Sequence, residues 1–79
     1  MEKEEQEYKQ FLEQQLQWCK KQDNILAKIE IKLHEMKTIA QYILDHELTA
    51  IEIDRLNHQF KELQKEFHLL EAQLQSVVH

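Results

Sequence analysis

The sequence contains neither glycine nor proline among its 79 residues. Average usage would give about nine of the two together. Glycine-rich phosphate loops, the sharp nucleophile turn of hydrolases and the common two-residue hairpin turns all depend on glycine. The lack of both residues therefore disfavours nucleotide-binding folds, hydrolases and small β proteins, and it leaves an all-α fold as the expectation.

Cysteine and long apolar runs are also scarce. Cys19 is the only cysteine, so the chain cannot form an internal disulfide. No apolar run approaches the length of a signal-peptide core or a membrane span. These features predict a soluble protein of the reducing cytoplasm with no membrane partner.

Charge of positive sign is in the minority, with ten basic against fifteen acidic residues and a formal net charge of −5. The basic residues of the first half alternate with acids, which is typical of a solvated helix surface. A duplex-binding domain normally carries a basic face. We therefore expect no nucleic-acid partner.

The clearest local signal that is present is a helix start at Thr49. The Thr49 hydroxyl and the Glu52 side chain have the spacing of a capping box, and Leu48 and Ile53 have that of a hydrophobic staple. Apolar residues then recur at alternating spacings of three and four: Ile53, Leu56, Phe60, Leu63, Phe67, Leu70, Leu74 and Val77. This pattern predicts a helix over about 49–77 with one narrow apolar stripe.

Apolar residues with the same alternating spacing occur earlier in the chain, at Leu26, Ile29, Leu33, Met36, Ala40 and Ile43. This spacing predicts a first helix over about 3–45, followed by a short loop over 46–48. Because no glycine is available, we expect His46 to end this helix in the left-handed conformation. A short loop makes consecutive helices antiparallel neighbours.

The two stripes fit one register. In an antiparallel pair of helices, the residue numbers of two facing positions add up to a constant. Six successive pairs, from Ile43 with Ile53 to Leu26 with Leu70, all give 96. The sequence thus predicts a single domain over 1–79, an antiparallel, coiled-coil-like helical hairpin with a long first helix.

Residues 2–18 have no partner in this hairpin, yet they are rich in large apolar side chains. Either residues 3–20 fold back as a third helix after a break near residues 22–24, or one long helix packs on another subunit. A seven-residue spacing continues across the suspected break, through Leu12, Cys19, Leu26, Leu33 and Ala40. It favours one continuous helix of about forty residues.

A second apolar stripe lies one position earlier on the first helix, with Lys32 as its exception. We expect the hairpin to leave this stripe exposed and a second copy to cover it by two-fold symmetry, completing a bundle as a homodimer. The candidate interface residues are Tyr8, Phe11, Leu12, Leu16, Trp18, Ile25 and Ile39.

No constellation of catalytic residues is visible, and no cofactor or metal site is predicted. His34, His46, His58 and His68 are ten or twelve residues apart, so no two lie on one helical turn. The sequence therefore predicts a non-enzymatic protein-interaction module that acts as an oligomer and binds another protein. The alternative is a structural subunit whose assembly is itself the function.

Overall fold

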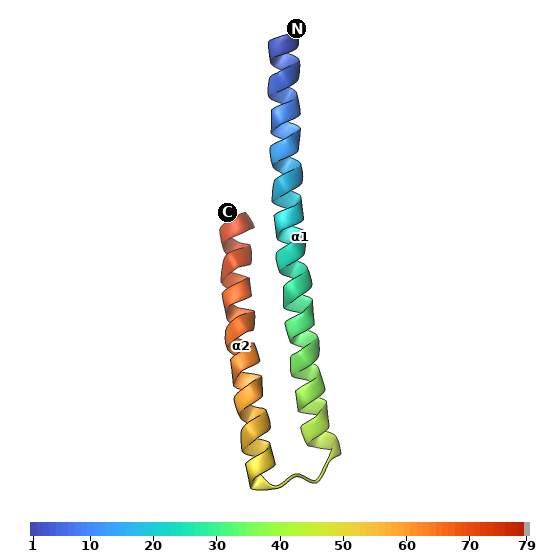
Figure 1. Ribbon diagram of the computed structural model, residues 1–79, viewed down its shortest axis with the longest axis vertical. Helices are drawn as coiled ribbons and strands as arrows, with labels where there is room; N and C mark the ends of the chain where they lie inside the picture. Colours follow the sequence, from blue (N-terminus) through green and yellow to red (C-terminus); the bar gives the residue numbers. More distant parts are fainter. Residues whose placement is uncertain (79) are drawn as a thin grey trace.

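The computed structural model describes residues 1–78 and contains two helices. Helix α1 spans Glu2–Asp45 with 44 residues, and α2 spans Ala50–Val78 with 29 residues. They lie side by side in opposite directions, in a rod of 72 × 18 × 13 Å (Figure 1). The predicted all-α helical hairpin with a long first helix is confirmed. Because α1 continues unbroken through residues 22–24, the alternative third helix over 3–20 is wrong.

The start of α2 is fixed by the predicted cap. The Glu52 backbone amide donates to the Thr49 hydroxyl oxygen at 3.2 Å, and the hydroxyl donates to the Glu52 carboxylate at 3.1 Å. Leu48 and Ile53 are both half-buried, as a hydrophobic staple requires. The cap satisfies one of the helix's first free amides and sets where the chain reverses.

The end of α1 differs from the prediction. His46 has φ −126° and ψ 147°, so it is extended, and no residue in the described part of the chain has a positive φ. Its Nδ1 donates to the Tyr42 carbonyl at 2.9 Å, and the two rings stack with centroids 4.0 Å apart. A side chain thus satisfies a terminal carbonyl, and the left-handed conformation is not needed.

The hairpin seam is the set of side chains by which the two helices face each other. On α2 it is the predicted stripe, since all eight of its residues are half-buried. On α1 the facing side chains are Gln22, Ile25, Ile29, Lys32, Met36, Ile39 and Ile43. Ile25, exposed by only 6%, is the one buried residue among those described.

The predicted face of α1 is therefore wrong in part. Ile29, Met36 and Ile43 face α2 as expected, but Leu26, Leu33 and Ala40 are exposed. The residues one position earlier take their place, and because the shared row stays in the seam, the packed face of α1 is turned by about half of the 100° that separates neighbouring residues. Branched Ile39 fills the space that small Ala40 would leave open, so the second apolar stripe, not the first, completes the seam.

Candidate protein interface

Helix α1 extends well beyond the end of α2, as Figure 1 shows. We call residues 2–17 the overhang. Every residue in it is exposed, including Tyr8 at 65%, Phe11 at 54% and Leu16 at 56%. Isolated globular domains rarely expose several large apolar side chains on one segment, so the overhang is a candidate binding surface.

Trp18 marks the boundary between the overhang and the hairpin. Its indole Nε1 donates to the Val77 carbonyl, 59 residues away in the sequence, near the end of α2. The expectation that residue 18 has no hairpin partner is therefore wrong. The bond satisfies one of the last carbonyls of α2, which no amide of the same helix can reach.

The seven predicted interface residues divide into two groups. Tyr8, Phe11, Leu12 and Leu16 lie in the overhang and are exposed, and Trp18 follows directly. Ile25 is buried and Ile39 half-buried in the hairpin seam, so the expectation that the hairpin leaves them exposed is wrong. The overhang is thus the part of α1 that still lacks a packing partner.

A further line of apolar side chains follows the solvent side of α1, and we call it the outer stripe. Its members are separated by four, ten, seven and eleven residues, which keeps them on one broad side of the helix: Leu12, Leu16, Leu26, Leu33 and Leu44. Leu26 and Leu33 are exposed by 41% and 40% because the seam uses the neighbouring isoleucines. The outer stripe joins the overhang at Leu12 and Leu16.

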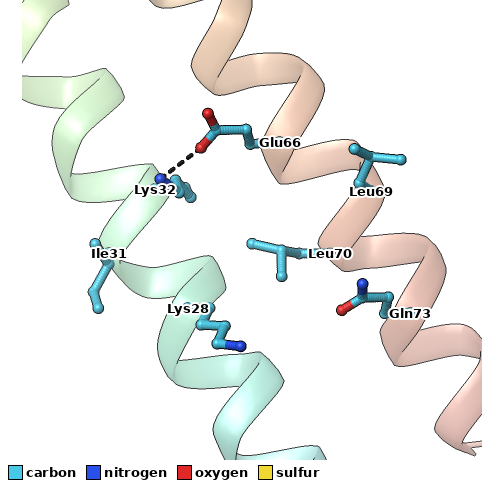
Figure 2. A pocket seen from close by; sticks show the side chains of 7 residues that line it. All are labelled: Lys28, Ile31, Lys32, Glu66, Leu69, Leu70 and Gln73. Atoms are coloured by element: carbon cyan, nitrogen blue, oxygen red, sulfur yellow. Dashed lines mark ion pairs between the residues drawn. The ribbon is translucent and has the colours of Figure 1, made fainter.

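An ion pair crosses the hairpin at Lys32, the charged position within the seam. Its Nζ lies 2.6 Å from Glu66 Oε2 and 4.0 Å from Glu35 Oε2. Figure 2 shows the pair at one end of an open groove, with Leu70 pointing between the helices. The side-chain hydrogen bond to Glu66 raises the pKa of Lys32 above its ordinary value, and the negative charge of Glu35 adds to this effect. In the sequence Lys32 only interrupts the second apolar stripe. Its partner Glu66 lies 34 positions away, so the pair could not be predicted without knowing which residues of the two helices face each other.

The hairpin also brings together two histidines that are distant in the sequence. His34 and His58, from opposite helices, line one groove with Glu35 and Glu62. Spacing within a single helix could not reveal this pair. Within residues 1–78, however, no group of three or more histidine, cysteine or acidic side chains is placed to hold a metal ion. His68 instead pairs locally, with its Nδ1 3.0 Å from the Glu71 carboxylate.

No protein-family model matches this chain, and no curated protein or solved structure is significantly similar to it. Neither helix, over the described residues, contains a stretch long and apolar enough to cross a membrane. The surface of the hairpin is therefore the basis for assigning a function.

Proposed function

We propose that this protein is a non-enzymatic interaction module of the cytoplasm that self-associates as a homodimer through α1 and binds another protein. The proposal depends on the part of α1 that extends beyond the end of α2. The large apolar side chains there are exposed: Tyr8, Phe11, Leu12 and Leu16. Aromatic residues dominate the binding energy of protein interfaces.

The scarcity of buried surface supports self-association. A chain of 79 residues with one buried side chain in its described part gains little from burial inside a single hairpin. Packing on a second copy would add the missing apolar contacts in coiled-coil fashion. Cys19 is exposed and unpaired, and a reducing cytoplasm would keep such a thiol from oxidising.

Sedimentation equilibrium combined with affinity capture tests this function. The full chain should sediment close to twice 9.7 kDa. Leu12→Glu combined with Leu16→Glu should abolish capture of any protein that the parent retains, because both side chains are exposed and apolar.

Ile51→Glu is the matched control, since Ile51 is exposed by 73% and lies in the first turn of α2, which begins at the end of the rod away from the overhang. Glutamate is also favourable in the first turn of a helix. This variant should retain self-association and capture. A parent that stays monomeric, together with identical capture by all variants, would contradict the proposal.

A further inference from the structure

We propose that the overhang binds the overhang of a second copy in antiparallel orientation, so that each supplies the helix that α2 is too short to provide. This inference rests on the proposed self-association and specifies its geometry. Three observations carry it: the continuity of the seam, the matching lengths and the distribution of charge.

The first observation is that the seam face of α1 continues past the end of α2. The spacing that places Gln22 and Ile25 against α2 continues through Trp18, Gln15, Phe11 and Tyr8 on the same side of the helix. The seam is thus filled by α2 up to Trp18 and vacant beyond it. A helix is the shape that fits a continuing coiled-coil seam.

The second observation is length. The vacancy begins where α2 ends and covers residues 2–17. The overhang of a second copy has the same length, because the two chains are identical. It covers the whole unpaired segment when residue 2 of one copy faces residue 17 of the other. In this register Tyr8 faces Phe11 of the second copy, and Glu4 faces its Gln15. The amide of Gln15 can donate to the Glu4 carboxylate, which gives a polar seam residue a partner.

The third observation is charge. Residues 2–7 carry four glutamates and one lysine, whereas residues 12–17, which face them in this register, carry one glutamate and no lysine. Parallel overhangs would place the two acidic segments side by side, which is repulsive. Antiparallel overhangs separate the two acidic segments and place each opposite residues 12–17, with Lys20 and Lys21 about one helical turn beyond residue 2 of the other copy.

Distances between spin labels on the full-length dimer test this arrangement. The paired overhangs have their midpoint between residues 9 and 10, so labels on the native Cys19 should be about 28 Å apart along the axis. In a second variant, Cys19→Ser with Gln10→Cys, the labels should be less than about 20 Å apart.

Other arrangements give different pairs of distances. Parallel overhangs give short distances at both positions. Two α1 helices packed antiparallel along their whole length give about 14 Å along the axis at Cys19 and about 40 Å at position 10. Either result would overturn the inference while leaving self-association intact, whereas a monomer in sedimentation would refute the proposed self-association itself.

Paired substitutions provide a second readout that needs no label. Tyr8→Ala with Phe11→Ala should raise the dimer dissociation constant by about tenfold or more, since both aromatic side chains face the second copy. Leu26→Ala with Leu33→Ala, on the outer stripe, should leave this constant within about threefold of the parent value. The reverse ranking would assign the dimer contact to the outer stripe and would overturn the inference.

Discussion

Lys32 shows how the position of a single side chain in the fold can depend on a partner that is distant in the sequence. Along the sequence it interrupts the second apolar stripe of α1. In the hairpin its ammonium reaches Glu66 at 2.6 Å, so the charge stays paired at the edge of the seam. A long lysine side chain can cross apolar surface and keep its charged end at the solvent boundary.

This ion pair predicts a dependence of stability on pH. The hydrogen bond to Glu66 raises the pKa of Lys32 above 10.5 in the folded chain. A group with a raised folded-state pKa stabilises the fold fully below its unfolded-state pKa, and that contribution is lost as pH rises through the folded-state pKa. Urea unfolding at one fixed protein concentration, from about pH 9 to about pH 11.5, should show the parent losing stability relative to Lys32→Met.

Glu66→Gln provides the partner variant for this experiment, because it keeps the lysine and removes the carboxylate that raises its pKa. Its stability should also fall less than that of the parent over the same pH range. Equal pH dependence in the parent and both variants would show that the pair makes no contribution.

At the scale of the element, α2 was predictable and the face of α1 was not. On α2 one narrow stripe follows a capping box, so only one face could pack. On α1 two apolar stripes share Ile29, Met36 and Ile43, so choosing the other stripe leaves three facing pairs unchanged and lowers the sum of residue numbers from 96 to 95 in the other three. The sequence pattern does not resolve that difference. The choice depends on the volume of Ile39 against Ala40 and on the cross-helix ion pair.

The choice of face is testable by truncating one residue from each stripe. Ile25→Ala should lower the free energy of unfolding by about 2–5 kcal/mol, because Ile25 is the buried residue of the seam. Leu33→Ala should cost about 1 kcal/mol or less, because its side chain is 40% exposed. Urea denaturation at one protein concentration measures both. A larger cost for Leu33→Ala would restore the originally predicted face.

The cap of α2 makes a separate prediction. Thr49→Ala removes the hydroxyl that accepts a hydrogen bond from the Glu52 backbone amide. It should lower the free energy of unfolding by about 1 kcal/mol. Thr38→Ala is the matched control, since the Thr38 hydroxyl only donates to the His34 carbonyl within α1. That substitution should be neutral or slightly stabilising, because alanine has the higher helix propensity. Equal losses in the two variants would mean that the cap is not what fixes the start of α2.

At the scale of the whole molecule, sequence reasoning identified the overhang but misplaced its boundary. The constant sum of facing residue numbers predicted that residue 18 lies beyond the end of α2. In the structure, the long indole side chain of Trp18 reaches the Val77 carbonyl. Sequence reasoning also assigned Ile25 and Ile39 to a second copy, because it had placed them outside the seam. What remains for a second copy is the overhang, whose apolar side chains have no partner within the hairpin.

If the second copy supplies that partner, folding and association must be coupled, since the hairpin alone buries little apolar surface. The midpoint of thermal unfolding, followed by circular dichroism, should then rise with protein concentration. Each tenfold increase adds about 1.4 kcal/mol to the stability of a dimer, which corresponds to about 3–6 °C for two chains of this size. Tyr8→Ala with Phe11→Ala should melt at a lower temperature with a weaker dependence on concentration. A parent whose midpoint stays constant over a hundredfold range of concentration would be a self-sufficient monomer, and its overhang would need a partner other than itself.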